Sequence, residues 1–301
     1  MGAKIAYPKG WSGGISIRGI PIVNTAPANV FYVSSVTGAS TNSGKTQSKP
    51  LATVAQAVAK CTASRGDIVF CLPGHVETFA TAAALTLNKI GVQVIGLGIG
   101  TIRPTFTFSD TASQVVMSAA NVGIHNCIHT CAVDSLVNGF ALTAAGISFT
   151  GNTFNYTSTN DSLMWILTDS GSDDFVFQNN YCLGDHAGPT EFMRLIGVDR
   201  AIITDNFISG SYSTAVINGI TTASTNLLID NNTLMNSVTD KLWIDLVASC
   251  TGRIQNNVGT VVSTAGITDA NIIDAANCQL SGNYASDAAG ETGRLIGVVS
   301  A

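Results

Sequence analysis

Short apolar segments alternate with turn-forming residues along most of this chain, and one pattern repeats. Six segments share the form apolar-x-apolar-x-x-Asn-x-x: ISFTGNTF (147–154), FVFQNNYC (175–182), AIITDNFI (201–208), LLIDNNTL (227–234), GRIQNNVG (252–259) and CQLSGNYA (278–285). Their asparagines are separated by 28, 26, 26, 25 and 26 residues: Asn152, Asn180, Asn206, Asn232, Asn257 and Asn283. Two further segments, VGIHNCIH (122–129) and VQVIGLGI (92–99), fit with Cys127 and Leu97 in the Asn position. The chain therefore repeats one structural unit.

A second short strand is predicted ahead of each motif. Examples are QVVMSAA (114–120), FALTAAG (140–146), MWILTDSG (164–171), FMRLIGV (192–198), STAVING (213–219) and LWIDLVAS (242–249). These repeats leave no room for the crossover helices of a β–α–β sheet, and their spacing does not fit a sandwich. Three short strands per repeat fit a coil that stacks on the previous one at about 4.8 Å. The sequence therefore predicts an all-β fold, a right-handed parallel β-helix of about eight or nine coils over residues 66–301.

The recurring asparagines have a structural explanation in such a coil. Each falls at a turn between strands, where a side-chain amide can bond backbone groups that the bend leaves free. Amides that are one coil apart can also bond each other as a ladder. We therefore interpret Asn152, Asn180, Asn206, Asn232, Asn257 and Asn283 as a structural ladder rather than as sugar or metal ligands.

The open ends of a stack need covers, and residues 29–65 provide one. A strand, NVFYV (29–33), is followed by a loop and by PLATVAQAVAKC (50–61), which we predict to be a capping helix that begins at Pro50. Leu51, Val54, Ala55 and Val58 would form its buried face. RGDIVFCLPGHVET (65–78) then reads as the first coil, with a Pro-Gly corner.

The Gly-Lys-Thr in the loop between them is not a nucleotide site. A phosphate loop has four residues between its first Gly and the Gly-Lys pair, whereas Gly38 and Gly44 have five between them. The helix also begins too late to place its N-terminal N–H groups at Lys45. The stretch is predicted to be a polar surface loop.

Composition narrows the class of protein. Only 11% of the residues are charged, against about 25% in an ordinary soluble domain. The net charge of −5 argues against nucleic-acid binding, and neither a membrane span nor an export signal is evident. The seven cysteines form no CxxC pair, so they are expected to be reduced, buried thiols.

One stretch carries a family resemblance. KPLATVAQAVAKCTASRGDIVFCLPGHVET (49–78), followed by Asn-punctuated coils, resembles the opening of pectate-lyase-like β-helix proteins. It resembles especially those encoded among the virion genes of tailed bacteriophages. The match covers roughly residues 30–300 and is specific for the fold, which hosts lyases, hydrolases and inert structural proteins alike.

Residues 1–28 lie outside the repeat and are predicted to be an extended N-terminal arm. Apolar and aromatic side chains of the kind that anchor protein interfaces occur here beside basic ones: Tyr7, Trp11, Ile15, Ile17 and Arg18. Docking on another protein is the preferred interpretation, and packing along the chain's own β-helix is the alternative.

Catalytic candidates are few. If the chain were an enzyme, the best carboxylates would be Asp169, Asp173 and Asp174, with Asp185 and Glu191 about one turn away. The Gly-His-Gly and Arg-x-Lys of polygalacturonase-like hydrolases are absent, and so is the basic cluster of the lyases. Asp at coil corners is also common in turns. His125 and His129, on one short strand, are candidate metal ligands, but no third ligand is evident, and we expect no metal or cofactor.

Together these features favour a structural protein of a tailed-phage virion, made in the host cytoplasm and located on the capsid surface as a decoration or cement protein. It would bind the major capsid protein or another virion protein through its arm. A tailspike-type glycan depolymerase that uses the carboxylates between 169 and 199, or binds a host surface glycan, is the alternative. A bacterial polysaccharide lyase is disfavoured because no export signal is seen. The resemblance implies a homotrimer, and Trp165 and Trp243 are expected to face outward and contribute to it.

Overall fold

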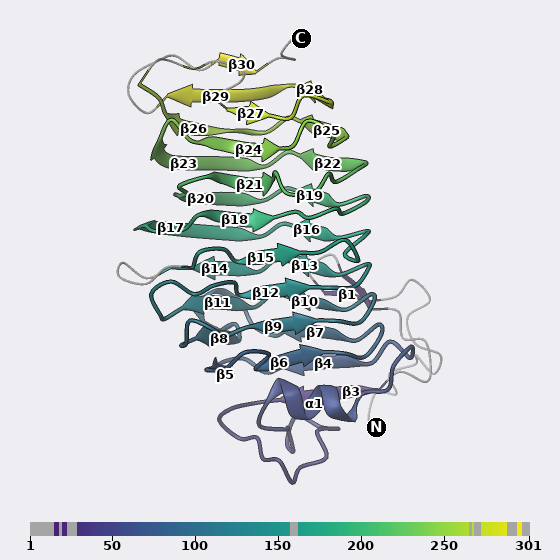
Figure 1. The fold of residues 1–301 in the computed structure, drawn as a ribbon. Helices are drawn as coiled ribbons and strands as arrows, with labels where there is room; N and C mark the ends of the chain where they lie inside the picture. Colours follow the sequence, from purple (N-terminus) through teal and green to yellow (C-terminus); the bar gives the residue numbers. More distant parts are fainter. Residues whose placement is uncertain are drawn as a thin grey trace, which may run out of the picture.

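The computed structural model of this chain is shown in Figure 1. It describes residues 15–17, 20–22, 29–156, 162–264, 267, 272–287 and 294–296; side chains at 15–22, 185–187 and 294 are outside the description.

Three β-sheets wrap around one elongated core (Figure 1). Sheet 1 consists of β3 (Val30–Val33), β4 (Ile68–Cys71), β7 (Gln93–Gly96), β10 (Gly123–His125), β13 (Ser148–Thr150), β16 (Val176–Gln178), β19 (Ile202–Thr204), β22 (Leu227–Asp230), β25 (Gly252–Gln255) and β28 (Cys278–Ser281). Sheet 2 consists of β5 (Val76–Phe79), β8 (Thr105–Phe108), β11 (Ile128–Cys131), β14 (Thr153–Asn155), β17 (Tyr181–Ala187), β20 (Phe207–Ser211), β23 (Thr233–Thr239), β26 (Val258–Val262), β29 (Asn283–Asp287) and β30 (Arg294–Ile296). Sheet 3 consists of β6 (Leu85–Leu87), β9 (Val115–Met117), β12 (Phe140–Leu142), β15 (Ile166–Thr168), β18 (Glu191–Arg194), β21 (Ala215–Gly219), β24 (Leu242–Leu246) and β27 (Ile273–Asp274).

Each strand pairs in parallel with the strand three elements later, so one coil contributes one strand to each sheet. Two strands of these sheets depart from this pattern: β3 pairs in parallel with the next strand, β4, and β30 pairs antiparallel with β29 at the C-terminal end of the stack. Because sheet 3 has eight strands, eight coils contribute a strand to all three sheets. The predicted fold class, an all-β parallel β-helix with a helix at its N-terminal end, is confirmed.

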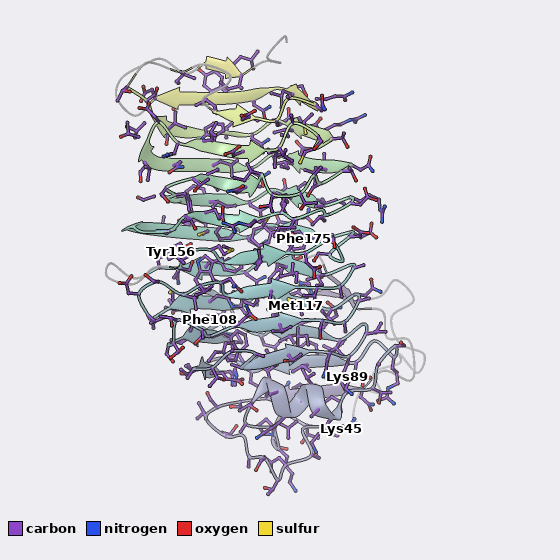
Figure 2. All side chains as sticks on the ribbon, in the orientation of Figure 1. Lys45, Lys89, Phe108, Met117, Tyr156 and Phe175 are labelled. Carbon is purple, nitrogen blue, oxygen red and sulfur yellow. The ribbon has the colours of Figure 1, made fainter. Side chains whose placement is uncertain are left out.

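The core lies inside the coils, where strand alternation sends every second side chain. Phe108 from sheet 2, Met117 from sheet 3 and Phe175, just before β16 of sheet 1, are each 0% exposed and lie within the stack (Figure 2). The inward aromatic rings stack from coil to coil; for example, Phe154 and Phe177 have centroids 5.7 Å apart. Burying one such side chain stabilises the fold by about 1.5–3 kcal/mol. The stack is thus held together by continuous apolar columns.

Helix α1 (Val54–Lys60) covers the N-terminal end of the stack (Figure 1). The Thr53 side chain accepts a hydrogen bond from the Gln56 N–H, and the Glu77 carboxylate accepts one from the Val54 N–H at 2.9 Å. These acceptors satisfy backbone donors that a helix start leaves open.

Two details of the predicted helix were wrong. It begins at Val54 rather than at Pro50, because Leu51 instead extends sheet 1: its N–H donates to the Tyr32 carbonyl at 2.8 Å. The buried face also differs from the predicted one, since Ala57 is buried and Ala55 is exposed.

The Gly-Lys-Thr loop is fixed by local contacts. The Lys45 ammonium donates to the Asn29 side chain at 2.6 Å and lies 4.0 Å from the centre of the Phe31 ring. Gly44 has a φ of +73°, and its carbonyl accepts from the Tyr32 N–H. Helix α1 begins well after Lys45, so the loop has no anion site of the phosphate-loop kind.

Trp165 and Trp243 do not face outward, so this expectation was wrong. Both are 0% exposed. Trp165 packs against Phe108 and Phe154 in the core, with ring centroids 5.4 Å apart in each pair. Trp243 donates its indole N–H to the Thr260 carbonyl at 3.1 Å. Each lies beside the first residue of a sheet 3 strand, and the Ile that follows it, Ile166 or Ile244, is also 0% exposed, so the inward–outward alternation fails at this point.

Of the predicted arm, only two short strands are described. β1 (Ile15–Ile17) and β2 (Ile20–Ile22) pair antiparallel, so this part is a hairpin rather than a single extended segment. Tyr7, Trp11 and Arg18 lie outside the described residues.

All seven cysteines are buried and free, as expected. No helix in the described ranges is both long enough and apolar enough to span a bilayer.

Candidate functional site

The six ladder asparagines form one buried column at the turn between sheets 1 and 2, with exposures of 0–3%. The amide Nδ2 atoms of the first five donate to the Oδ1 of the asparagine one coil further on, at 2.9–3.2 Å. The backbone N–H of each of these five bonds the same oxygen. Every Nδ2 also donates to a backbone carbonyl of the previous coil. With these bonds made, the amides are committed to holding coils together.

The residue before each ladder position explains the local sequence. It adopts a left-handed conformation, with φ of +56° at Asn126, +68° at Gly151 and +59° at Asp205. Asn, Gly and Asp are the residues that tolerate this conformation best. Cys127 occupies the next ladder position, and its backbone N–H donates to the Asn152 Oδ1 at 3.1 Å. Beyond Asn152, the first asparagine, the column therefore continues by one coil toward the N-terminus through a backbone N–H alone.

The carboxylates predicted as catalytic candidates are placed in separate locations. Asp169 lies in the turn after β15, where its Oδ1 accepts from the Gly171 N–H at 2.8 Å and from the Ser172 hydroxyl at 3.3 Å. Asp110 and Ser113 form a similar turn after β8. Asp169 thus stabilises its own turn, and the side chain of Asp185 is outside the described residues.

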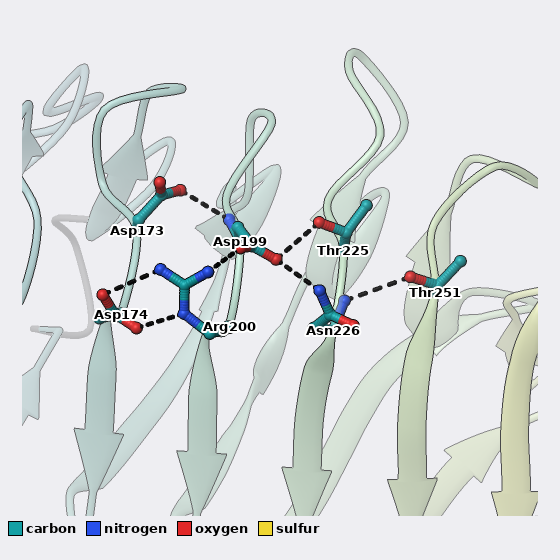
Figure 3. A network of polar contacts seen from close by, with 7 residues as sticks. All are labelled: Asp173, Asp174, Asp199, Arg200, Thr225, Asn226 and Thr251. Carbon is teal, nitrogen blue, oxygen red and sulfur yellow. Dashed lines mark hydrogen bonds and ion pairs between the residues drawn. The ribbon is translucent and has the colours of Figure 1, made fainter.

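Asp173 and Asp174 lie at the corner that leads into sheet 1, within a polar network that runs across four coils (Figure 3). Arg200 reaches back one coil and binds Asp174 with two parallel bonds, Nε to Oδ1 at 2.7 Å and Nη2 to Oδ2 at 3.1 Å. Its Nη1 pairs with Asp199. Asp173 accepts from the Asp199 backbone N–H at 2.8 Å.

The network continues toward the C-terminal coils. Asp199 accepts from the Thr225 hydroxyl at 2.8 Å and from the Asn226 amide at 2.7 Å, and the Asn226 N–H donates to the Thr251 hydroxyl (Figure 3). The bond from Arg200 holds the pKa of Asp174 below its usual range, and those from Asn226 and Thr225 do the same for Asp199. Carboxylates that are ionised and occupied in this way are poor general acids. The corner network therefore joins coils and offers little to a substrate.

Glu191 lies apart from these residues, on β18 of sheet 3. Its side chain is 0% exposed, pairs with Arg194 and accepts from the Asn218 amide at 2.6 Å. Burial raises its pKa, although Arg194 acts in the opposite direction.

The outer face of sheet 3 holds a polar row that sequence reasoning missed. Adjacent strands place Arg194 beside Asn218, Asn218 beside Asp245, and Asp245 beside Asp274. Asp245 is half-buried and Asp274 is exposed. Burial, followed by the charge of Asp274, raises the pKa of Asp245. This row combines a carboxyl group that favours its proton with a neighbouring exposed carboxylate.

Two neighbouring carboxyl groups are the catalytic groups of most glycosidases. Neighbouring strands lie about 4.8 Å apart, which is close to the separation of about 5–5.5 Å between the two carboxyl groups of a retaining glycosidase. The signal was present in the sequence: WIDL (243–246) and IIDA (272–275) both place Asp after an inward Ile. The two Asp positions coincide when the strands of sheet 3 are aligned on their inward Ile residues.

The two histidines considered as metal ligands are on different strands, so the single short strand assumed for them was wrong. His125 is on β10 and bonds the Gln93 side chain through Nε2 at 2.8 Å. His129 is on β11 and is packed in the core between Phe106 and Phe154, with ring centroids 5.8 and 4.9 Å away. Residues 29–156, 162–264 and 272–287 contain no group of three His, Cys, Asp or Glu side chains suited to a metal.

An open groove of about 520 Å³ crosses the outer face of sheet 1 near its C-terminal end. Its lining residues are Asn226, Leu227, Leu228, Thr251, Gly252, Arg253, Asn277 and Gln279. These offer hydrogen bonds and one cation but no carboxylate, so the groove has no acid–base pair.

No protein-family model matches this chain, and no curated protein matches it. Among solved structures, a rhamnogalacturonan lyase is similar, with 14% sequence identity, a TM-score of 0.44, and coverage of 85% of this chain and 87% of that one.

Proposed function

We propose that this chain is a structural protein of a tailed-bacteriophage virion, a decoration or cement protein on the outer surface of the capsid. Residues 1–28 would attach it to the major capsid protein or to another virion protein. It would be synthesised in the host cytoplasm and act in the assembled particle.

One observation carries the proposal. The corner carboxylates Asp173 and Asp174 join one coil to the next, and so does the asparagine column. Polar side chains that bond neighbouring coils to each other are typical of a protein with a structural role. The resemblance of residues 49–78 to the opening of phage β-helix proteins supports the same assignment.

Immunogold electron microscopy of the phage particles whose genome encodes this chain tests the proposal. Gold over the heads is expected. Gold confined to the tail tip would overturn the decoration role and favour the second candidate below. Particles that bind no antibody, while the infected cell lysate does, would overturn the assignment to the virion.

A second candidate function is favoured by the carboxyl pair of sheet 3. In a tailspike-type glycan depolymerase, Asp245, whose pKa is raised by burial and by Asp274, would act as the general acid on the glycosidic oxygen and Asp274 would attack the sugar carbon. The partly exposed Arg194 would hydrogen-bond a neighbouring sugar group. In this version of the hypothesis the sheet 3 pair takes the place of the carboxylates that bond a turn, a corner and the Arg194 side chain: Asp169, Asp173, Asp174 and Glu191.

Release of reducing ends from the host's surface polysaccharide tests this second function. Asp245→Asn and Asp274→Asn should each lower the rate by at least about 100-fold. Asp134→Asn, at an exposed turn outside the row, is the control and should leave the rate unchanged. If the wild-type protein releases no reducing ends from that polysaccharide, sheet 3 is not a hydrolytic site.

A further inference from the structure

The outer face of sheet 2 is largely uncharged, and the Arg103 guanidinium contacts it by donating to the Thr153 hydroxyl at 2.6 Å. Strand register places its outward side chains in two columns from β5 to β29. The first consists of Val76, Thr105, Ile128, Thr153, Tyr181, Phe207, Thr233, Val258 and Tyr284. The second consists of Thr78, Thr107, Thr130, Asn155, Leu183, Ser209, Met235, Thr260 and Ser286. None of these eighteen positions is charged, and none is buried.

The other two faces differ from this one. The outward columns of sheet 1 include Asp230 and Arg253, and that of sheet 3 includes Arg194, Asp245 and Asp274. Sheet 2 instead exposes large apolar groups: Val76 (52%), Tyr181 (44%), Leu183 (49%), Val258 (44%) and Tyr284 (46%). Tyr181 and Phe207 stack across adjacent coils with centroids 4.8 Å apart. An exposed apolar surface of this extent typically marks an interaction site.

The surface is extensive enough to form most of a standard interface. The eight steps from β5 to β29 give a height of about 38 Å, and two outward columns with their side chains give a width of about 13 Å. The projected area is therefore roughly 500 Å², against about 800 Å² per partner in a standard interface, and side chains that flank the face would supply the rest.

The geometry also indicates the partner. Rows of side chains spaced by about 4.8 Å fit best against rows of the same spacing, and another copy of this chain presents such rows over the full height. Cyclic symmetry about an axis parallel to the stack brings each residue to the same height as its equivalents in the other copies. Tyr181 would then meet Tyr181, and Leu183 would meet Leu183. The eighteen column side chains allow this self-contact, because none of them is charged and no like charges among them are brought together.

We propose that copies of this chain associate through the outer face of sheet 2, with their stacks parallel around a common axis. The trimer expected from the sequence would be built by this face rather than by Trp165 and Trp243. The inference is independent of the virion assignment, since it rests on the surface of the isolated β-helix.

Light scattering of the full chain, coupled to size exclusion at micromolar concentration, tests the proposal. The wild-type protein should elute as an oligomer, about 93 kDa for three chains of 31.1 kDa. Leu183→Lys and Val258→Lys should each shift it to the mass of one chain, because symmetry brings identical ammonium groups together. Circular dichroism should show that both variants remain folded, since both side chains are exposed.

Ile202→Lys and Ile220→Lys are the matched controls, being exposed apolar residues (38% and 50%) outside this face. Both should remain oligomeric. A single-chain mass for the wild-type protein would overturn self-association. An oligomer that survives the two face substitutions and dissociates with a control would assign the contact to another surface.

Cysteine crosslinking tests the parallel arrangement. All seven native cysteines are buried, so an added surface thiol reacts selectively. Thr233→Cys, in the first outward column, should form a disulfide with its own equivalent and give a two-chain band on a non-reducing gel. Thr204→Cys, on the outer face of sheet 1, should not. A band from Thr204→Cys alone would contradict the proposed face.

Discussion

Asn206 lies in the middle of the amide column and is bonded on both sides. Its Nδ2 donates to the Asn232 Oδ1 and the Phe177 carbonyl, and its Oδ1 accepts from the Asn180 amide and backbone N–H. Asn206→Leu leaves these buried partners unsatisfied, so we expect it to lower the free energy of unfolding by about 1–3 kcal/mol. Denaturant unfolding monitored by circular dichroism measures this change.

Asn283 provides the comparison, because it stands at the end of the column. Its oxygen accepts from Asn257, but no ladder asparagine follows it. Asn283→Leu should therefore cost less than Asn206→Leu. Equal melting temperatures for wild-type protein and both variants would show that the column does not stabilise the stack.

His129 gives the core a pH dependence. It is fully buried among aromatic rings, and burial lowers its pKa to about 3, from 6.5 when unfolded. The unfolded chain therefore takes up a proton below pH 6.5 that the folded chain refuses, and stability falls as the pH falls. Between pH 8 and pH 5 this amounts to about 2 kcal/mol.

In His129→Phe that loss should disappear. The variant should lose about 2 kcal/mol less than the wild-type protein between pH 8 and pH 5, whatever its stability at pH 8. Unfolding titrations at several pH values measure this difference. His125, whose pKa is lowered to about 4 by burial, remains in both proteins and cancels. Parallel pH profiles would contradict a neutral, buried His129.

At the scale of elements, the sequence predicts the positions of strands better than the directions in which their side chains point. The Asn spacing fixes the coil length, and the short apolar runs fix three strands per coil, so β12, β15 and β21 lie where expected. Trp165 and Trp243 could not be oriented from the sequence, because each is buried together with the residue that follows it, so the alternation along the strand fails there. The start of α1 was predicted too early because Leu51 pairs with Val33 of sheet 1, a contact between residues far apart in the sequence that the local helix signal does not reveal.

The candidate carboxylates show the same limit. Asp169, Asp173 and Asp174 are neighbours in sequence, but a turn and a corner separate their roles. Asp245 and Asp274 are distant in sequence, but the stacking of coils makes them neighbours. In a β-helix, the residues of a site come from equivalent positions of successive coils. The repeats must therefore be aligned separately for each of the three sheets before such a site can be recognised in the sequence.

The cap of α1 can be tested separately from the stack. Thr53→Val keeps the branched shape and removes the hydroxyl that accepts from the Gln56 N–H, so it should lower the free energy of unfolding by about 1 kcal/mol. Thr62→Val, at an exposed position after the helix, is the control for the effect of replacing Thr by Val. Hydrogen exchange should show faster exchange at Gln56 in Thr53→Val. Unchanged exchange there would mean that the cap does not hold the helix start.

At the scale of the whole molecule, the β-helix is a stack in which each coil contacts mainly its neighbours. Its stability is then approximately a sum over coils and the contacts between them. Deleting residues 1–28 removes none of the eight aligned motif segments, so the remaining body should fold and melt much as the full chain does. Circular dichroism and thermal unfolding of the truncated protein measure this.

Attachment is where the truncation should matter. If residues 1–28 dock on the capsid, the truncated protein should stay soluble and fail to bind capsids in a co-sedimentation assay. Buried aromatic anchors usually dominate an interface, so Trp11→Ala should weaken attachment by about 2 kcal/mol or more. Lys4, Lys9 and Arg18 are basic in a chain of net charge −5, so added salt should slow attachment more than it speeds release.

The truncation also decides between the two interpretations of the arm. A truncated protein that decorates capsids at full occupancy would place attachment on the β-helix itself. The arm would then be part of the body's own packing, and its loss should lower the melting temperature. Occupancy and melting temperature therefore distinguish the two interpretations. Lost binding with an unchanged melting temperature identifies an attachment element. Retained binding with a lower melting temperature identifies a segment that packs on the β-helix.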